Sequence, residues 1–335
     1  MIIRLGIVGC GAITESLHLP AAALQNEVVV NSLVDVDLEL AARLASRFGI
    51  AQVTSSICDC KDLDAVLIAT PPHVRIPLVQ QAVSMGLHVL AEKPLGNSWK
   101  DCEAQIHAAN SAGKILAAAH VYRFWPSRQK IFDAICSQEF GRVQRIDVSQ
   151  GKPYSWKSVT GYTMQKELVP GGVLINAGIH PLDSLLWWMG DPVSFDYTDD
   201  SIGGLESNCF LDMQFAGDIH ATLKMSRTSE LEHFIHIQTD RGMIDLPTYA
   251  RDHFFVEQDG VRQKVTCRHK PKTDHEHLCA ARDQLIDFAE AIRLNRPPKV
   301  SGEEGARVVR LIEECYRTKK QRPLPKMAPV PGELW

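Results

Sequence analysis

This sequence has no long apolar run and no excess of one charge sign, and each absence excludes a class of protein. No apolar segment reaches the roughly 18 residues that a membrane-spanning helix needs. The 36 basic and 40 acidic side chains nearly balance, which leaves no electrostatic signature of a nucleic-acid-binding or membrane-surface protein. We therefore expect neither nucleic acid nor a membrane among its partners.

The sequence also lacks a cysteine framework. Its nine cysteines are scattered, and only Cys58 and Cys60 lie close together. An odd number of cysteines with no Cys-x-x-Cys pair is typical of reduced thiols, so we expect a cytoplasmic protein. Residues 1–13 are apolar but contain glycines and lead into polar residues, which indicates a buried strand entering a turn rather than a signal peptide.

The first part of the chain alternates between two patterns. β-rich apolar runs are followed by segments of helical period, each of which ends at a glycine. The expected strands are residues 2–8, 28–34, 65–69, 88–91 and 114–119, and the expected helices are 38–48, 74–85 and 98–112. In the first of these helices, Leu40, Leu44 and Phe48 form one stripe. This alternation predicts a parallel sheet covered on both faces.

The pattern changes after His120, and we expect the domain boundary near residue 121. Apolar residues alternate with polar ones at 208–215 and 219–225, which predicts an antiparallel sheet with one wetter face. Further strands are expected at 143–149, 233–238 and 243–246, and helices at 126–138, up to about Met189, at 275–294 and at 303–319.

The first strand runs into a glycine turn, Gly9-Cys-Gly-Ala-Ile13, that opens a helix. Gly9 and Gly11 allow close backbone approach to a pyrophosphate, which Ala12 and Ile13 would meet at the helix N-terminus. Asp35 ends the second strand, near the position about 20 residues on where a carboxylate binds the ribose hydroxyls. Together these features predict a dinucleotide-binding domain. The alternative interpretations are that the glycine turn is only a tight turn and that Asp35 is only a helix-entry residue.

The charge near Asp35 favours one form of the cofactor. Asp35 is followed by Val36 and Asp37, with no Arg or Lys beside them. A 2′-phosphate would meet two carboxylates there, so the sequence favours NAD over NADP.

Several motifs resemble one oxidoreductase family. They are the glycine turn, Ala69-Thr-Pro-Pro-His, His88-Val-Leu-Ala-Glu-Lys-Pro-Leu, Gly171-Gly-Val-Leu-Ile-Asn-Ala-Gly-Ile-His-Pro-Leu-Asp and Val300-Ser-Gly-Glu-Glu-Gly-Ala-Arg. In this order, over nearly the whole chain, they resemble the glucose–fructose oxidoreductase / inositol dehydrogenase / rhizopine-catabolism family (Gfo/Idh/MocA). Thr14 departs from the family pattern, and so does Asn176, which stands where many members have aspartate.

The resemblance implies an α/β fold. An N-terminal Rossmann domain, residues 1–121, would be followed by an α/β (α+β) substrate-binding and oligomerisation domain, residues 122–335, with a large open, mostly antiparallel sheet. The last helix, about 303–319, would pack back on the Rossmann domain. The resemblance also implies a homodimer or homotetramer and a cis bond before Pro94. The cofactor-binding residues that it adds are Thr70, Pro71, His73, Glu92 and Lys93.

Oxidising a secondary alcohol requires a hydride acceptor and a proton acceptor. The nicotinamide supplies the first, and His180 is the candidate for the second because its unperturbed pKa is about 6.5. Lys93 would donate a hydrogen bond to the reacting oxygen. Asn176, four residues before His180 on the expected helix, would orient His180 or a substrate hydroxyl.

The further candidates for binding a sugar-like substrate lie between Lys93 and Asn176 in the sequence. Tyr122 and Arg123 follow the last Rossmann strand, and Trp156, Tyr162 and Lys166 precede Gly171. For Arg123 an interdomain salt bridge is the alternative, and for Trp156 a loop anchor. Asp183 would bind substrate or hold His180.

The leading function is an NAD-dependent dehydrogenase, or in reverse a ketoreductase, for a sugar, sugar derivative or cyclitol. A redox-assisted glycosidase that oxidises a ring hydroxyl transiently is a second interpretation, and a non-catalytic NAD-binding regulator is a third. His275 and His277 point apart at helical spacing, and no other cluster has ligand spacing, so we expect no metal site.

Overall fold

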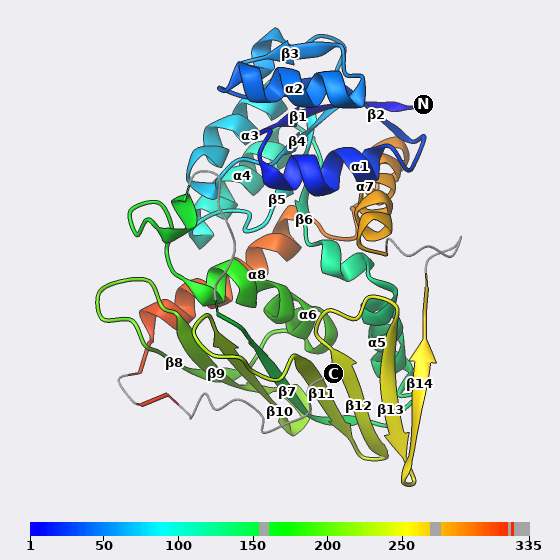
Figure 1. Cartoon of the computed structure of the whole chain (residues 1–335), viewed down its shortest axis with the longest axis vertical. Coiled ribbons are helices and arrows are strands. Elements are labelled where there is room, and N and C mark those ends of the chain that lie inside the picture. The colour runs from blue at the N-terminus through cyan, green and yellow to red at the C-terminus, as the bar shows by residue number, and fades with distance from the viewer. Residues whose placement is uncertain (154–160, 269–275, 321–322, 325–335) are drawn as a thin grey trace. The chain divides into compact units, whose positions relative to one another are not determined.

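The computed structural model describes residues 1–153, 161–268, 276–320 and 323–324. Two compact units can be distinguished within it (Figure 1). The first comprises Met1–Phe124 and His277–Arg310, and the second comprises Trp125–Glu276 and the chain from Leu311 onward.

The first unit contains a six-stranded sheet in the order β3-β2-β1-β4-β5-β6, with every pair parallel. The strands are β1 (Ile3–Val8), β2 (Val28–Val34), β3 (Gln52–Thr54), β4 (Ala65–Ile68), β5 (His88–Glu92) and β6 (Leu116–Ala119). This is the order of a doubly wound dinucleotide-binding domain, as the sequence predicted. The order reverses between β1 and β4, so the carboxyl ends of these strands form the switch point at which ligands bind.

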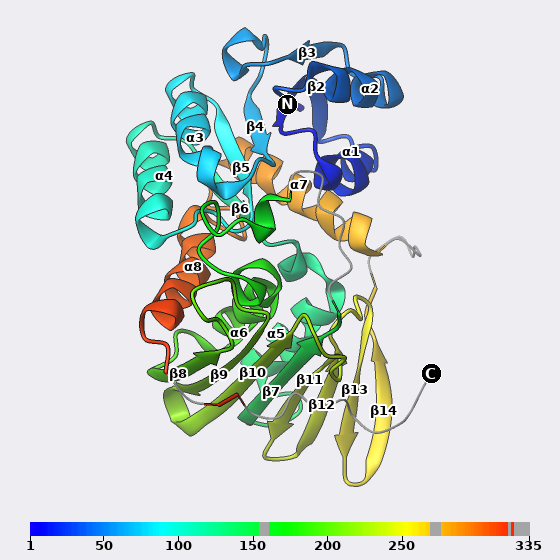
Figure 2. The same ribbon diagram turned by 60° about the vertical axis from the view of Figure 1, so that its left-hand side comes forward.

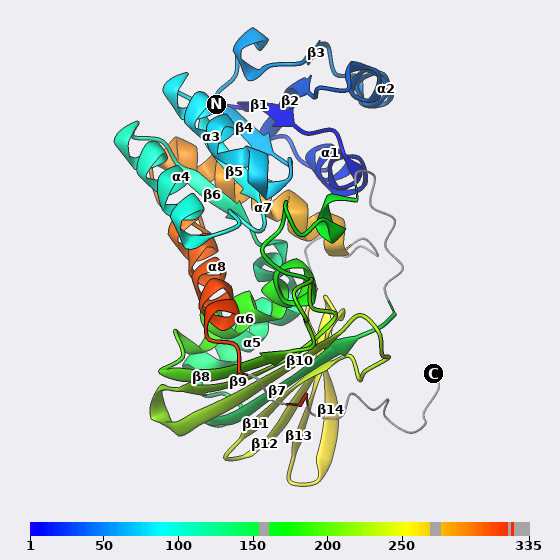
Figure 3. The ribbon, with the colours of Figure 1, turned by 90° about the vertical axis from the view of Figure 1, so that its left-hand side faces the viewer.

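Helices cover both faces of this sheet, with α3 and α4 side by side on one face and α1 on the other (Figures 2 and 3). The helices are α1 (Leu19–Ala22), α2 (Leu38–Phe48), α3 (Arg75–Ser84), α4 (Trp99–Ser111) and α7 (Glu276–Leu294). Local sequence defines their ends: Asp37 caps α2 by accepting from the Leu40 amide, and Gly49 ends it at a φ of +70°. Of the stripe expected on α2, only Leu44 is fully buried.

The helix α8 (Gly302–Arg317) begins in the first unit, where it packs closely on β6. Ala306 and Val309 belong to the same buried cluster as the inner residues of α3 and α4. A Cβ atom on Gly305 would lie 2.3 Å from the Cβ atom of Ala118, so this contact requires glycine.

The second unit contains an eight-stranded sheet in the order β14-β13-β12-β11-β7-β10-β9-β8. Only β7 and β10 pair in parallel, so the sheet is mostly antiparallel, as predicted. The strands are β7 (Val143–Gly151), β8 (Ser194–Asp199), β9 (Asn208–Phe215), β10 (Ile219–Ser226), β11 (Phe234–Thr239), β12 (Gly242–Pro247), β13 (His253–Gln258) and β14 (Val261–Thr266).

The two faces of this sheet differ in polarity. The helices α5 (Pro126–Ser137) and α6 (Ile179–Met189) lie on one face (Figure 3). The apolar stripe of β9, namely Cys209, Leu211, Met213 and Phe215, is at most 1% exposed. On the polar face Asp147 accepts hydrogen bonds from Arg145 and from Thr222, at 2.6 Å each. This confirms the predicted alternation of buried and wetter positions.

The structure departs from the predicted elements in two ways. The strands β3, β8, β13 and β14 were not predicted. β3 is only three residues long, β8 and β13 each bury at most two apolar side chains on one face, and β14 is exposed along most of its length. Two five-residue π turns, Thr14–His18 and Leu174–Gly178, interrupt segments that were expected to be regular α-helix. No described helix is long and apolar enough to cross a membrane.

Candidate active site

The turn after β1 packs tightly against the end of β4 at its first glycine and is open at its second. Gly9 has a φ of +96°, and a Cβ atom there would lie 3.0 Å from the carbonyl carbon of Ala69. A Cβ atom at Gly11 would meet nothing within 4 Å. Thr14, where the family pattern has a small residue, donates its hydroxyl to the Gly9 carbonyl at 2.6 Å. Thr14 therefore closes the turn.

Residues 12–22 are helical and start directly at this turn. The first amides of a helix have no carbonyl partner four residues earlier, and the helix dipole makes this end attractive to anions. Ala12 and Ile13 stand there, half-buried, at the predicted pyrophosphate position.

Asp35 is half-buried and supports the glycine turn. Its Oδ2 accepts the Cys10 amide at 2.6 Å, and its Oδ1 accepts the Asp37 amide at 2.9 Å. An ionised carboxylate has about four acceptor positions, so capacity remains for ribose hydroxyls. The open space at Gly11, the helix N-terminus and this carboxylate fit a dinucleotide.

The second part of the site in this unit is the turn that follows β5. Its Lys93–Pro94 bond is cis, as the resemblance implied. The Glu92 side chain folds over the turn: Oε2 accepts the Lys93 amide at 3.0 Å, and Oε1 lies 2.9 Å from Nε2 of His18. His18 is 1% exposed.

Arg75, the first residue of α3, connects this turn to the one after β4. Its guanidinium is 1% exposed and donates to the carbonyls of Glu92 and Pro94. It also donates to the Thr70 carbonyl at 2.5 Å. The predicted cofactor-binding segments around Thr70 and Lys93 are therefore held together by one buried cation.

Burial and the neighbouring charges shift the pKa values of Lys93 and Glu92. Burial lowers the pKa of Lys93, the Glu92 carboxylate opposes this, and the Arg75 cation lowers it further, with a net decrease. Burial alone would raise the pKa of Glu92, but the hydrogen bond from His18 and the charges of His18, Lys93 and Arg75 bring it below its ordinary value.

The other candidates of the first unit have different environments. Thr70 and Pro71 are half-buried beside this turn, and His73 is exposed on the short helical turn Pro72–Val74. Tyr122 is half-buried, whereas Arg123 is 2% exposed and ion-paired with Glu304 at 2.8 Å. Because Glu304 also belongs to the first unit, this ion pair lies within that unit.

In the second unit, a buried carboxylate organises the turn that precedes α6. Glu206 is 3% exposed and accepts the amides of Gly172 at 2.5 Å and Leu174 at 2.9 Å. The Tyr316 hydroxyl donates to Glu206 at 2.8 Å and accepts the Ile175 amide at 3.2 Å. Burial raises the pKa of Glu206 in spite of these hydrogen bonds.

The same contacts explain the paired glycines of the motif. A Cβ atom on Gly171 would lie 2.0 Å from the Tyr316 hydroxyl, and one on Gly172 would lie 2.0 Å from the Glu206 carbonyl oxygen. The Gly-Gly pair is therefore required by packing within this unit.

The residues of this unit that were predicted to be catalytic come a few positions after the Gly171-Gly172 pair in the sequence. Asn176 lies in the π turn Leu174–Gly178, and His180 is the second residue of α6. Both side chains are half-buried. The expectation of one regular α-helical turn between them was wrong, because π hydrogen bonds join residues five apart. Single π turns are frequent at functional sites.

Asp183 is 1% exposed in α6, so it lies in the interior of this unit. Tyr162 is half-buried, and Lys166 is exposed and donates to the carbonyl of Gly203. Trp156 and His275 lie outside the described residues.

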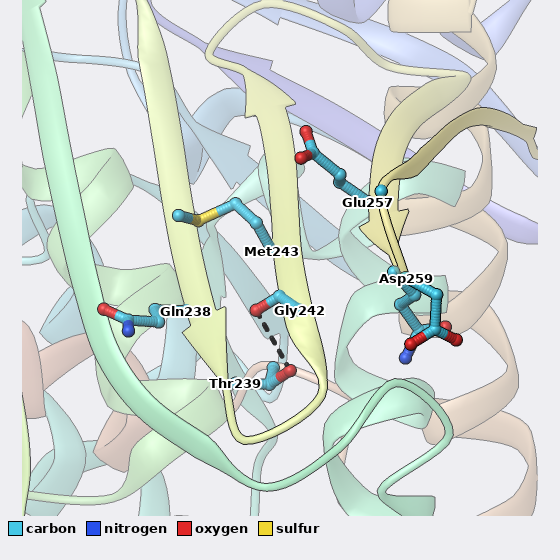
Figure 4. Close-up of a pocket in the computed structure, with 8 residues that line it drawn as sticks. Gln238, Thr239, Gly242, Met243, Glu257 and Asp259 are labelled. Carbon is cyan, nitrogen blue, oxygen red and sulfur yellow. Dashed lines mark hydrogen bonds between the residues drawn. The ribbon is translucent and has the colours of Figure 1, made fainter.

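A hollow of about 300 Å³ lies at the tips of the β11–β12 and β13–β14 hairpins (Figure 4). None of the predicted site residues lines it. It is bordered by Gln238, Thr239, Gly242, Met243, Glu257, Gln258, Asp259 and Gly260. Among the residues that the structure describes, no group of three or more His, Cys, Asp or Glu side chains could hold a metal ion.

Sequence reasoning missed four residues that position these turns: His18, Arg75, Glu206 and Tyr316. Each acts on a partner far away in the sequence, such as Glu92, which is 74 residues from His18. Arg75 has the same local pattern as a surface arginine on a helix. The unexplained Gly171-Gly172 pair was the one available signal, because paired glycines before a helix indicate a close neighbour.

Comparison with known proteins agrees with this architecture. The family model described as an oxidoreductase family with an NAD-binding Rossmann fold matches residues 3–120, and its C-terminal α/β domain matches residues 133–326. An uncharacterized oxidoreductase of Rhizobium meliloti is 28% identical, over 95% of this chain and 97% of that protein. D-xylose 1-dehydrogenase (NADP(+)) 2 of Haloferax volcanii is 25% identical, over 93% and 96%.

Solved structures show the same fold. Aldose–aldose oxidoreductase from Caulobacter crescentus superposes with a TM-score of 0.85 at 22% identity, covering 95% of this chain and 97% of that one. Levoglucosan dehydrogenase in complex with NADH and levoglucosan gives 0.84 at 20% identity, with the same coverage. With both family models matched in order along the chain, this protein belongs to the Gfo/Idh/MocA family of oxidoreductases.

Proposed function

We propose that the protein is an NAD-dependent dehydrogenase, or in reverse a ketoreductase, acting on a secondary hydroxyl or ketone of a sugar, sugar derivative or cyclitol. The observation that carries the proposal is the half-buried Lys93, which Glu92 and Arg75 hold at the carboxyl end of β5, on the sheet that carries the glycine turn. The relative named for D-xylose supports the substrate class.

The cofactor would be held by residues of the first unit. Gly9, Gly11, Ala12 and Ile13 would take the pyrophosphate, and Asp35 the ribose hydroxyls. When bound, the nicotinamide supplies the hydride chemistry. Relatives and fold neighbours include proteins named with NADP and with NADH. We propose NAD for this chain because a 2′-phosphate beside Asp35 would add like charge.

The remaining steps belong to side chains. Lys93 would donate a hydrogen bond to the reacting oxygen and stabilise the negative charge that develops there. His180 would take the hydroxyl proton on an imidazole nitrogen in oxidation and return it in reduction. Asn176 would orient His180 or a neighbouring substrate hydroxyl, since an amide cannot take the proton itself. Tyr122, Arg123, Trp156 and Lys166 remain our proposed substrate contacts.

We also propose a homodimer or homotetramer, to be measured by light scattering after gel filtration.

All nine cysteines are thiols, which supports a reducing compartment such as the cytoplasm.

The function can be tested with a panel of sugars, sugar nucleotides and cyclitols, read as NADH absorbance. Lys93→Met is the control, because it keeps bulk and removes the donor. Removing one such donor typically costs about 10²–10³ in turnover. Steady NADH formation that falls by at least that factor in Lys93→Met supports the proposal. Product formation without net NADH would favour the redox-assisted glycosidase instead. Turnover of Lys93→Met within a few-fold of the wild type would contradict the role of Lys93.

A further inference from the structure

Glu92, the residue before Lys93, forms a buried hydrogen-bonded pair with His18, a residue that neither the sequence motifs nor the proposed reaction uses. His18 is 1% exposed, and its Nε2 is 2.9 Å from Oε1 of Glu92. His18 is the last residue of the π turn Thr14–His18, which belongs to the helix that starts at the glycine turn. A buried polar side chain needs a hydrogen-bond partner, because leaving a buried donor or acceptor unsatisfied costs about 1–3 kcal/mol. His18 and Glu92 therefore hold each other in place.

The same carboxylate reaches Lys93 through its second oxygen. Oε2 of Glu92 accepts the Lys93 amide at 3.0 Å, so one side chain ties the backbone of Lys93 to the helix that carries His18. On either side of Lys93, the Arg75 guanidinium donates hydrogen bonds to the carbonyl oxygens of Glu92 and Pro94. The Glu92 carboxylate and the Arg75 guanidinium thus fix the backbone around Lys93, so the Lys93 side chain begins at a defined position.

Glu92 of this pair also influences the charge state of the Lys93 ammonium. The charged groups identified near Lys93 are Glu92, in the adjacent position of β5, and Arg75 of α3; those near Glu92 are His18, Lys93 and Arg75. Burial and the Arg75 cation both favour neutral Lys93, and the Glu92 carboxylate opposes them. A displaced Glu92 would weaken the attraction that opposes these two effects, so the pKa of Lys93 would fall further.

We propose that His18 is a positioning residue for the chemistry of Lys93: by holding Glu92, it keeps the carboxylate where it maintains Lys93 as an oriented, protonated donor. This inference rests on the proposed function of Lys93, and it adds a residue outside the motifs that suggested that function.

The test measures the protonation of Lys93 directly and needs no substrate. Lysine reactivity towards acetic anhydride, followed by peptide mass spectrometry between about pH 7 and 11, gives the apparent pKa of each amine. Three variants are compared with the full-length wild type. His18→Leu removes the donor at similar volume, His18→Gln retains a donor near the position of Nε2, and Glu92→Gln removes the charge.

Glu92→Gln should lower the apparent pKa of Lys93 by roughly 1 unit, as expected for loss of an opposite charge within a few ångströms. His18→Leu should lower it in the same direction by a smaller amount, and His18→Gln should restore it. In the wild type the pKa of Glu92 lies below its ordinary value, so its carboxylate is ionised in this pH range. Lys93 and Arg75 still favour the ionised form in His18→Leu, so a shift in that variant reports a change in the position of the carboxylate. The alkaline limb of the kcat profile should move to lower pH in parallel.

The proposal is overturned if Lys93 in His18→Leu has the wild-type reactivity profile, even when the variant is less stable, because His18 would then be structural only. It is equally overturned if Glu92→Gln leaves the profile unchanged, a result available even if His18→Leu fails to fold. Shifted Lys93 profiles in a protein that oxidises no sugar would support the His18–Glu92–Lys93 coupling and count against the proposed function alone.

Discussion

Replacing Glu206 with glutamine tests whether this buried carboxylate organises the turn that precedes Asn176. The carboxylate accepts the amides of Gly172 and Leu174 on different oxygens, and the Tyr316 hydroxyl shares the second oxygen. A glutamine side chain has one acceptor oxygen and one NH₂ donor. In either orientation of the amide, the NH₂ group faces a backbone N–H, so one buried donor loses its acceptor.

The expected cost follows from this count. One buried donor left unsatisfied costs about 1–3 kcal/mol. For a unit of this size, each kcal/mol lowers Tm by about 2–4 °C, so Tm should fall by roughly 2–12 °C. The matched control is Glu167→Gln, the same chemical change at an exposed position of the same unit, which should stay within about 0.5 kcal/mol of wild type.

Differential scanning calorimetry between about pH 4 and pH 8 measures the wild type and both variants. The pKa of Glu206 is raised in the folded protein, chiefly by burial, so its stabilising contribution is fully present below its unfolded pKa of about 4.3. That contribution is lost as the pH rises through the folded value. The stability gap between wild type and Glu206→Gln should therefore be larger near pH 4 than near pH 8. If Glu206→Gln is as stable as the Glu167→Gln control at every pH, the turn does not depend on this carboxylate.

Three further predictions concern the two units. Gly9→Ala should weaken cofactor binding, measured by calorimetry, at least ten-fold. The new Cβ atom would lie 3.0 Å from the Ala69 carbonyl carbon, and the φ of +96° at this position strains an alanine. Unchanged affinity would show that cofactor binding does not depend on the shape of this turn. NAD should bind more tightly than NADP, and Asp35→Ser should narrow the difference, whereas tighter NADP binding by the wild type would reverse our interpretation of β2. His180→Asn should nearly abolish oxidation at neutral pH, and Asn176→Asp should move the acid limb of the pH profile to higher pH because a nearby carboxylate raises an imidazole pKa; an acid limb that stays in place would indicate another base.

Sequence patterns predicted those elements whose side chains alternate or repeat on one face. The stripe of β9 was identified residue by residue, because each apolar side chain faces the core. The strand β14, Val-Arg-Gln-Lys-Val-Thr, is exposed along most of its length and therefore carries no such pattern. Tertiary pairing with β13 determines it instead.

The same limit applies to the candidate site. The glycine turn and the cis bond before Pro94 depend on adjacent residues, so short motifs predicted them. The contacts of His18 and Arg75 with the Lys93 turn join segments far apart in the chain, and no local pattern encodes them. The π turn at Asn176 was missed for a related reason, since its apolar residues are compatible with either type of helix.

The measurement that tests the central claim most directly is the transfer of deuterium from substrate to cofactor. The protein is incubated with NAD and sugars or cyclitols deuterated at the carbinol carbons, and the reduced nicotinamide is analysed by mass spectrometry. Our account predicts deuterium at C4 of the nicotinamide, with a rate that falls by about 10²–10³ in Lys93→Met. Reduced cofactor without deuterium, or deuterium transfer at the wild-type rate in Lys93→Met, would contradict it.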